Sequence, residues 1–214
     1  MKTRAVLVTL AVTFAAATAQ AAVLFDFEST PATFTPPAAR TGALTSLALT
    51  NSGLTMTINR GRQFDIVSNT GAQAGKPAGW GLRSLDPFFA GSVNTPFIVD
   101  FSSLITSFSV EFGDYGGDSP DILSLMAYSG AGGTGTLLGS TSVSLNTPAG
   151  AFTVGSGSLS ASGIASIVMI GGSSAFPNSV FYDNVSVAVV PEPATLALLG
   201  LGLAGLAASR RRKQ

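Results

Sequence analysis

The residues of this chain that could do chemistry are chiefly its carboxylates, because it contains no His and no Cys. This composition excludes Ser-His-Asp and Cys-His catalysis, His- or thiolate-ligated metals and disulfides. Paired carboxylates hydrolyse glycosides when they face each other across a cleft, and grouped carboxylates bind Ca²⁺. The sequence alone pairs no two of them. We therefore expect a protein that is not an enzyme, with a glycan hydrolase as the weaker alternative.

One carboxylate falls where the pattern predicts an apolar face. Alternation along 180–189 places Asp183 on the same side as Val185, Val187 and Val189. A carboxylate on an apolar side must be hydrogen-bonded, protonated or bound to a cation. Either Asp183 contributes to a cation site, or it caps a β-bulge by accepting hydrogen bonds from backbone N–H groups.

The segment 113–121 contains three further carboxylates, Asp114, Asp118 and Asp121, interspersed with glycines. Such a loop could wrap a cation, but the spacing does not fit the EF-hand loop. Asp and Gly are also ordinary residues of tight turns. We therefore favour an acidic hairpin loop without a cation.

Trp80 is the single tryptophan, flanked by glycines and followed by Arg83. A sugar ring could stack on Trp80 with Arg83 beside it, but a lone Trp in a β-sandwich is more often part of the core, and we favour the core. Arg60 and Arg62 flank Gly61. We expect them at a solvated strand end, with binding of an acidic polysaccharide as the alternative.

The middle of the chain is typical of an all-β domain. In the clearest segment, Phe108, Val110 and Phe112 face one way and polar residues the other. Clusters of Gly, Ser, Asn and Pro separate such segments, and no useful stretch shows a helical period. We expect a two-sheet β-sandwich of jelly-roll type. The predicted strands are 23–28, 54–59, 97–101, 106–112, 122–128, 136–139, 142–145, 152–159, 164–170 and 180–189.

Charge excludes one class of partner. Six of the eleven basic residues and one of the eleven acidic residues lie in the two ends of the chain, so the middle has five basic and ten acidic residues, a net charge of −5. Nucleic acid binding needs a basic face. We therefore expect no nucleic acid partner.

The first 21 residues have the layout of a secretory signal peptide. Lys2 and Arg4 precede an apolar stretch that ends in Ala19-Gln20-Ala21, a small-x-small cleavage signal. We expect a signal helix that is exported by the Sec machinery and removed by signal peptidase after Ala21. A membrane anchor is the alternative, but the apolar run is short for one.

The last residues are ordered in three parts. Pro191-Glu192-Pro193 precedes an apolar helix predicted over 194–208, and a basic cluster follows it. The 15-residue run would span roughly 22 Å as a helix, and the bilayer core is ~30 Å thick. The basic cluster should remain cytoplasmic. It consists of Arg210, Arg211, Arg212 and Lys213.

This tail resembles the PEP-CTERM sorting signal of Gram-negative bacteria, many of which make exopolysaccharide. The resemblance implies that Pro191, Glu192 and Pro193 are recognised by an exosortase in the inner membrane. It implies that the basic cluster is the stop signal. The tail is also known as the ice-binding protein C-terminal domain, a name that describes the tail only. An ordinary single-pass anchor is the alternative.

The middle of the chain resembles, more loosely, jelly-roll domains of the carbohydrate-binding-module kind. The resemblance rests on Phe25-Asp26-Phe27-Glu28 at the start and on the segment 181–187 at the end. In such domains the first and last strands pair, and carboxylates from both hold a structural calcium. The resemblance therefore implies Asp26, Glu28 and Asp183 as calcium ligands; no other cofactor is expected.

Together these features predict a signal peptide at 1–21, a β-sandwich at 22–189 and a sorting signal at 190–214. We expect a non-catalytic protein that passes through the inner membrane to the periplasm, the cell surface or the extracellular matrix, where it associates with exopolysaccharide. A structural or adhesive matrix protein without a small ligand is the alternative. Ice binding would need a flat array of Thr, which Leu54-Thr55-Met56-Thr57 is too short to supply.

Overall fold

The computed structural model describes residues 22–36, 38–69, 76, 78–87, 94–190 and 202. The predicted signal helix, the apolar tail helix and the sorting residues Pro191, Glu192, Pro193 and Arg210 to Lys213 lie outside the described residues. Within the described part, no helix is long and apolar enough to span a membrane.

Strands dominate the described residues, as the alternation predicts. Two short 3-10 helices, η2 (Ala78–Trp80) and η3 (Ala131–Gly133), interrupt them. The strands are β1 (Val23–Phe25), β2 (Leu44–Asn51), β3 (Leu54–Ser68), β4 (Arg83–Asp86), β5 (Phe97–Tyr115), β6 (Asp121–Gly130), β7 (Thr134–Leu145), β8 (Phe152–Gly172) and β9 (Phe181–Val189).

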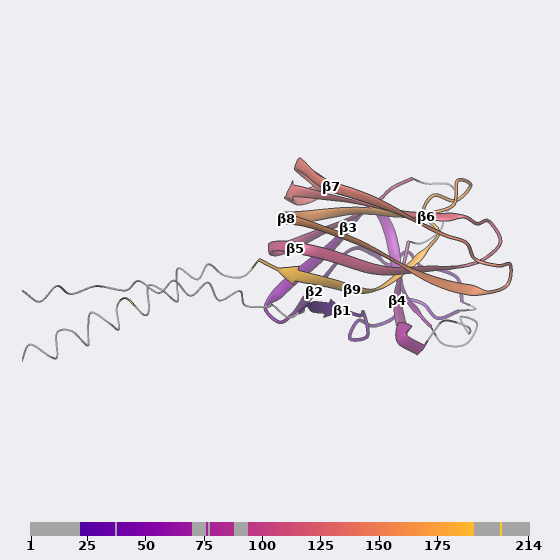
Figure 1. Cartoon of the computed structure of the whole chain (residues 1–214). Coiled ribbons are helices and arrows are strands. Elements are labelled where there is room, and N and C mark those ends of the chain that lie inside the picture. The colour runs from indigo at the N-terminus through magenta and orange to yellow at the C-terminus, as the bar shows by residue number, and fades with distance from the viewer. Residues whose placement is uncertain are drawn as a thin grey trace, which may run out of the picture.

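The strands form a β-sandwich whose two layers share the long strands β3, β5 and β8 (Figure 1). In one layer the order is β2, the first part of β3, the first part of β5, the last part of β8, β6 and β7. In the other layer β9 pairs with β1, with β4 and with the second part of β5. There the second part of β5 also pairs with the first part of β8, and the last part of β3 pairs with β4. The sandwich fold that the sequence predicts is confirmed.

The core lies between the layers and follows the predicted alternation. Phe108, Val110 and Phe112 are buried, and so are Val185 and Val187 opposite them. Burial of each such side chain stabilises the fold by about 1.5–3 kcal/mol. A smaller cluster joins Phe34, Val67, Trp80 and Phe181, with Tyr115, Phe152 and Val154 packed against it.

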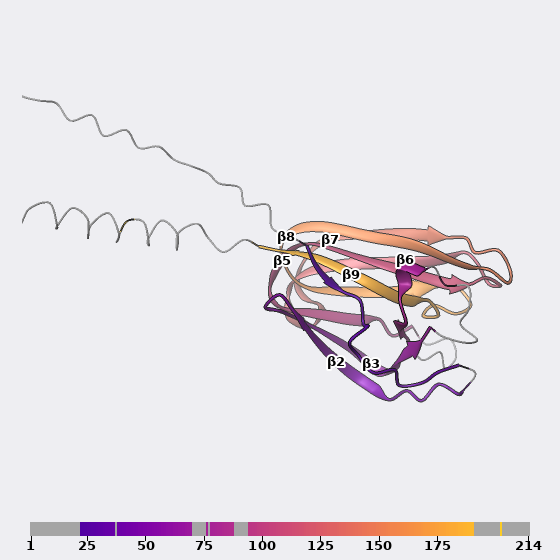
Figure 2. The same ribbon diagram turned by 90° about the horizontal axis from the view of Figure 1, so that it is seen from below.

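The first and last described strands pair antiparallel, with Val23 opposite Val187. Both ends of the sandwich domain therefore leave it at the same end (Figures 1 and 2). β5 runs away from that end, since Ile105 pairs with Val189 and Gly113 pairs with Phe181. At about 3.3 Å per residue, Asp114 lies ~30 Å along the strand from the level of Val189. The loop between β5 and β6 is thus at the end opposite the tail.

Several strand boundaries differ from the prediction. The prediction did not include β2 or β4, and β3 continues to Ser68. Three strands were each predicted as two shorter ones: β5 as 97–101 and 106–112, β7 as 136–139 and 142–145, and β8 as 152–159 and 164–170. The first strand is shorter, ending at Phe25, because Phe27 has a positive φ of 59°. Its predicted faces hold nevertheless, since Phe25 and Phe27 are buried and Asp26 and Glu28 are exposed.

Candidate functional site

A pocket of about 450 Å³ lies at the end of the sandwich opposite the tail. That volume is within the usual range for small-molecule sites. Three aromatic residues, Tyr115, Phe176 and Phe181, contribute to its wall, and Phe176 is 38% exposed. Its polar lining includes Arg40, Asp114 and Asp118. The pocket therefore combines apolar faces with charged groups of both signs.

Two carboxylates that line this pocket, Asp114 and Asp118, form a group with the buried Asp121, which does not line it. Asp114 is near the end of β5, Asp118 is in the following loop, and Asp121 begins β6. One oxygen from each lies within 4.8 Å of the others, and no other trio of carboxylates does so among the described residues. Ser173 donates a hydrogen bond to Asp118 Oδ2 at 2.6 Å. In Asp121, which is fully buried, both carboxylate oxygens lack a hydrogen-bond partner.

Burial and mutual repulsion disfavour the charged forms of this trio. Burial, together with the nearby Asp121 and Asp118, raises the pKa of Asp114 to about 7, against the opposing effects of the Tyr115 N–H and Arg40. Burial, together with Asp118, raises the pKa of Asp121 to about 6. These carboxylates therefore favour a bound proton or another positive charge.

Another buried carboxylate, Asp65, shows how this protein otherwise satisfies such a group. Asp65 accepts hydrogen bonds from the hydroxyls of Thr33 and Thr41 at 2.6 and 2.7 Å. The backbone N–H groups of Thr41, Gly42 and Ala43 donate at 3.1, 2.8 and 3.2 Å. Burial alone would raise the pKa of Asp65, but these donors outweigh it and lower the pKa. Asp121 has no comparable set of donors.

The loop between β5 and β6 is held by close backbone packing. A Cβ on Gly116 would lie 2.3 Å from the carbonyl oxygen of Pro148 and 2.4 Å from that of Thr147. The Gly116 N–H donates to the Ala151 carbonyl at 3.1 Å. Ser119 and Thr147 exchange hydrogen bonds at 2.9 and 3.1 Å. The loop that carries Asp118 therefore needs glycine at position 116.

The residues that the jelly-roll resemblance implies as calcium ligands meet at a different, smaller pocket of about 280 Å³. Asp26, Glu28 and Asp183 all line it. Glu28 Oε1 accepts hydrogen bonds from the N–H groups of Leu82 and Arg83 at 2.7 and 2.9 Å. The three carboxylates do not bring one oxygen each within 4.8 Å of one another.

Asp183 itself combines features of both interpretations drawn from the sequence. Its Oδ1 accepts the Asn184 N–H at 2.7 Å, as a capping role predicts. Its Oδ2 is buried without a partner. Burial raises the pKa of Asp183 to about 8, Glu28 and Asp26 contribute to the rise, and the Asn184 N–H and Lys76 oppose it.

Trp80 is 1% exposed and belongs to the smaller core cluster, the interpretation that the sequence favoured. Its ring packs edge-on against Phe152 with centroids 5.2 Å apart. The Lys76 ammonium lies 5.2 Å from the Trp80 centroid and 4.0 Å from that of Phe181. The neighbouring Arg83 donates through Nη1 to the Leu82 carbonyl at 2.9 Å.

The prediction of a solvated strand end at Arg60 and Arg62 is wrong for Arg60. Arg62 is exposed, but Arg60 is 6% exposed. Arg60 donates to the carbonyls of Thr95 and Gln63 at 3.2 and 3.0 Å, and it also bonds that of Pro87. The carbonyls of neighbouring loops therefore hold this guanidinium inside the fold.

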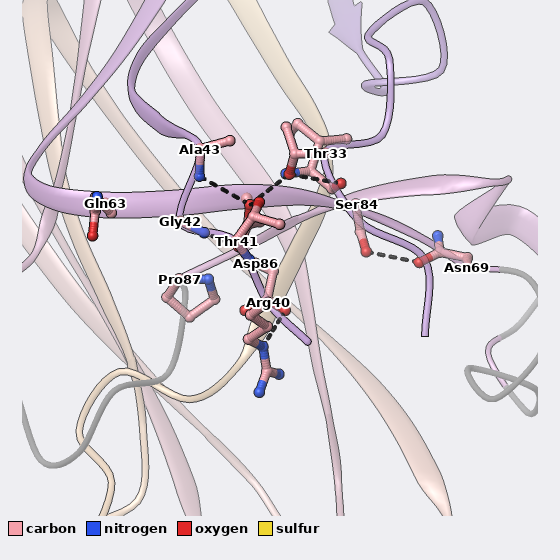
Figure 3. Close-up of polar contacts among 12 residues, drawn as sticks. Thr33, Arg40, Thr41, Gly42, Ala43, Gln63, Asn69, Ser84, Asp86 and Pro87 are labelled. Carbon is pink, nitrogen blue, oxygen red and sulfur yellow. Dashed lines mark hydrogen bonds and ion pairs between the residues drawn. The ribbon is translucent and has the colours of Figure 1, made fainter. Parts of the chain in front are cut away.

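Sequence reasoning singled out the acidic loop but missed its partners in the large pocket. Arg40 and Phe176 come from segments far from Asp114 in the chain, and neither residue carries a local motif. Arg40 Nε donates to Asp86 Oδ2 at 2.7 Å (Figure 3). That ion pair places Arg40 at the pocket, and only the fold reveals it.

Comparison with solved structures finds the same kind of fold at low identity. The K2 cleaved adhesin domain of Lys-gingipain matches with a TM-score of 0.51 and 11% identity over 79% of this chain and 99% of that chain. The N-terminal CBM22-1-CBM22-2 tandem domain from Paenibacillus barcinonensis Xyn10C matches with a TM-score of 0.44 and 15% identity over 85% of this chain and 53% of that chain. No curated protein matches the sequence.

Comparison with family models finds one match, at the tail. Residues 189–213 match the PEP-CTERM protein-sorting motif. The match covers the Pro-Glu-Pro sequence, the apolar segment and the basic cluster predicted above. Signals of this kind mark proteins exported to the cell surface or extracellular space. The chain is therefore a β-sandwich protein that carries a PEP-CTERM sorting signal.

Proposed function

We propose that this protein is a non-catalytic module that binds polysaccharide of the extracellular matrix in the pocket lined by Arg40, Asp114, Tyr115, Asp118 and Phe176. The observation that carries the proposal is this pocket at the end of the sandwich opposite the sorting tail. A protein held at the cell surface by its tail end would present such a pocket outward.

The lining suits a sugar. Aromatic rings offer flat apolar faces, and Tyr115 and Phe176 supply two of them. Sugar hydroxyls donate to carboxylates and accept from guanidinium groups, and the pocket offers both kinds of partner. A small number of polar groups in a largely apolar pocket is the usual composition of a specific ligand site.

The proposed route to the surface uses both ends of the chain. Sec export and signal peptidase would release the N-terminus after Ala21, and an exosortase in the inner membrane would recognise Pro191-Glu192-Pro193. The sequence pattern at the N-terminus and the motif match at 189–213 support this route.

A structural calcium at Asp26, Glu28 and Asp183 is a second candidate function, for the smaller pocket. It is supported by the buried, unpartnered Oδ2 of Asp183 beside two further carboxylates. Such an ion would join the first strand to the last.

Affinity electrophoresis tests the polysaccharide proposal. The full chain is run through native gels that contain neutral or acidic bacterial exopolysaccharides. We expect one class of polysaccharide to retard the wild type and Phe176→Ala to lose most of the retardation. Leu137→Ala is the matched control, because Leu137 is an exposed apolar residue on the edge strand β7 and does not line the pocket.

The alternatives predict different results. A purely structural matrix protein would migrate alike in every gel, and that result would overturn the proposal. A glycan hydrolase would release reducing ends from the retarding polysaccharide, and Asp118→Asn would stop the release. Equal retardation of the wild type and Phe176→Ala would place binding outside this pocket.

A further inference from the structure

We propose that Asp114, Asp118 and Asp121 bind a divalent cation, with Ca²⁺ as the ion that fits best, beside the large pocket that Asp114 and Asp118 line. The site connects the end of β5 to the start of β6. This inference concerns the protein without any glycan, and it stands independently of polysaccharide binding.

The strongest observation is the state of Asp121. Its side chain is fully buried, and neither carboxylate oxygen has a hydrogen-bond partner. A buried carboxylate without a partner costs several kcal/mol. Asp65 is equally buried and receives five hydrogen bonds. The fold satisfies one buried carboxylate with donors and leaves the other facing two more carboxylates, as a cation ligand would be.

The geometry of the trio fits a single ion. Calcium–oxygen distances are about 2.3–2.6 Å, so two ligands of one Ca²⁺ lie at most about 5 Å apart. The oxygens of Asp114, Asp118 and Asp121 are all within 4.8 Å of one another. One ion could therefore contact all three without rearrangement of the strands.

Among the residues that the structure describes, no basic side chain forms an ion pair with this trio. The basic residue that acts on Asp114 is Arg40, and its Nε is engaged with Asp86 Oδ2 at 2.7 Å. The positive charge that would balance the trio must then come from a proton or a bound ion.

Calcium suits the donor set better than other metals. All side-chain donors are carboxylate oxygens, which hard cations prefer, and the chain lacks His and Cys. Ca²⁺ accepts 6–8 oxygen ligands in flexible geometry, whereas Mg²⁺ demands a near-ideal octahedron at shorter distances. A glycine-containing loop can add carbonyl oxygens and leaves room for water ligands.

Calcium titration calorimetry of the full chain, stripped with a chelator and kept free of glycan, tests the inference. The matched pair of variants is Asp121→Asn and Asp183→Asn, because both residues are buried carboxylates, but only Asp121 belongs to the trio and only Asp183 lines the smaller pocket. We expect Asp183→Asn still to bind calcium. We expect the double variant, Asp183→Asn with Asp121→Asn, to have lost this binding. We expect MgCl₂ to compete weakly.

Stability measurements separate a ligand role from a merely structural one. In chelator, Asp121→Asn should melt at the same temperature as the wild type or higher, because it removes a like charge from the trio. In calcium, the wild type should melt higher than the variant. A wild type that is more stable than Asp121→Asn by the same amount in chelator and in calcium would overturn the proposal.

A second variant covers the case in which Asp121→Asn does not fold. Asp118 is only partly buried, and Asp118→Asn should weaken calcium affinity by roughly tenfold or more, since fewer charged ligands lower affinity. Terbium luminescence gives an independent readout, because Tyr115 adjoins Asp114 and can sensitise the ion, and Tyr115→Phe should dim the signal. Unchanged affinity in Asp118→Asn would contradict the site. Such a result would leave polysaccharide binding as a separate question.

Discussion

Asp114 and Asp121 come from two different strands, β5 and β6, yet place carboxylate oxygens within 4.8 Å of each other, beside the pocket that Asp114 lines. Both are buried, at 8% and 0% exposure. Two like charges at this distance repel most strongly where water is excluded. Their closeness therefore destabilises the fold unless a proton or a cation lies between them, and this links the two residues to cation binding.

Asp65 should be among the residues most important for stability. Asp65→Ala would leave three backbone N–H groups and two hydroxyls without their acceptor. We expect a loss of about 3 kcal/mol or more, since each abandoned buried donor costs about 1–3 kcal/mol. Urea denaturation measures it. A loss below about 1 kcal/mol would show that water replaces the carboxylate.

The position of the core can be tested with one aromatic residue. Phe108 is 1% exposed and packs between the layers. Phe108→Ala should destabilise the fold by about 3–5 kcal/mol. Ile122→Ala is the control, because Ile122 on β6 is 47% exposed and should cost about 0.5 kcal/mol or less. Similar losses for both variants would contradict the assignment of faces.

Gly116 should be sensitive to a single added carbon. Gly116→Ala places a Cβ 2.3 Å from the Pro148 carbonyl oxygen, and backbone cannot move aside as a side chain can. We expect a destabilisation of about 1–3 kcal/mol, typical of overpacking. The adjacent Gly117→Ala is the control, because a Cβ on Gly117 would have no atom within 4 Å beyond its chain neighbours. Thermal melts of the two variants should differ clearly; equal melting temperatures would disprove the close contact.

Lys76 should give the protein a stability that rises with pH. Burial lowers the pKa of Lys76 to about 7, and Asp86 and Asp183 only partly offset this. An unfolded Lys titrates near 10.4, so between about pH 7 and 10 the unfolded chain binds more protons than the folded one. The contribution of Lys76 to the free energy of unfolding therefore increases with pH in that window.

Lys76→Met isolates this contribution, because it keeps an apolar chain among Trp80, Phe152 and Phe181 and removes the titrating group. The free energy of unfolding of the wild type, relative to that of the variant, should increase from pH 7 to pH 10. Asp183 and Arg40 also act on Lys76 and are common to both proteins. A difference that does not change with pH would contradict the lowered pKa.

Side-chain alternation made much of the sandwich predictable. Phe108, Val110 and Phe112 were assigned to the buried face from their spacing alone, and Phe25 and Phe27 likewise. β2 was missed because most of its residues are exposed or half-exposed and show no clear apolar face. β4 was missed because four residues are too few to show a period.

Glycines within β8 make room for the core. The prediction divided this strand into 152–159 and 164–170, but it is continuous from Phe152 to Gly172. A Cβ at Gly155 would lie 3.0 Å from the Phe112 ring, and one at Gly157 would lie 2.7 Å from Leu123. These glycines make room for large core side chains. Their role depends on which residues face them across the layers, which the local sequence does not contain.

The candidate site was predictable only in part, for the same reason. The three carboxylates near the loop were visible as a group in the sequence, but their mutual distance and the burial of Asp121 follow from the pairing of β6 with β7 and β8. Arg40, Phe176 and the ion pair with Asp86 come together only through long-range contacts. Spacing identifies the residues; the register of the strands decides which of them meet.

The central claim, that this β-sandwich is exported and sorted by its tail, is tested most directly by intact-mass spectrometry of the protein recovered from the envelope and medium of its native host. We predict a polypeptide that begins near Ala22 and ends near Pro191. A mass that still includes the segment from Ala194 to Gln214 would contradict sorting and indicate a membrane-anchored periplasmic domain.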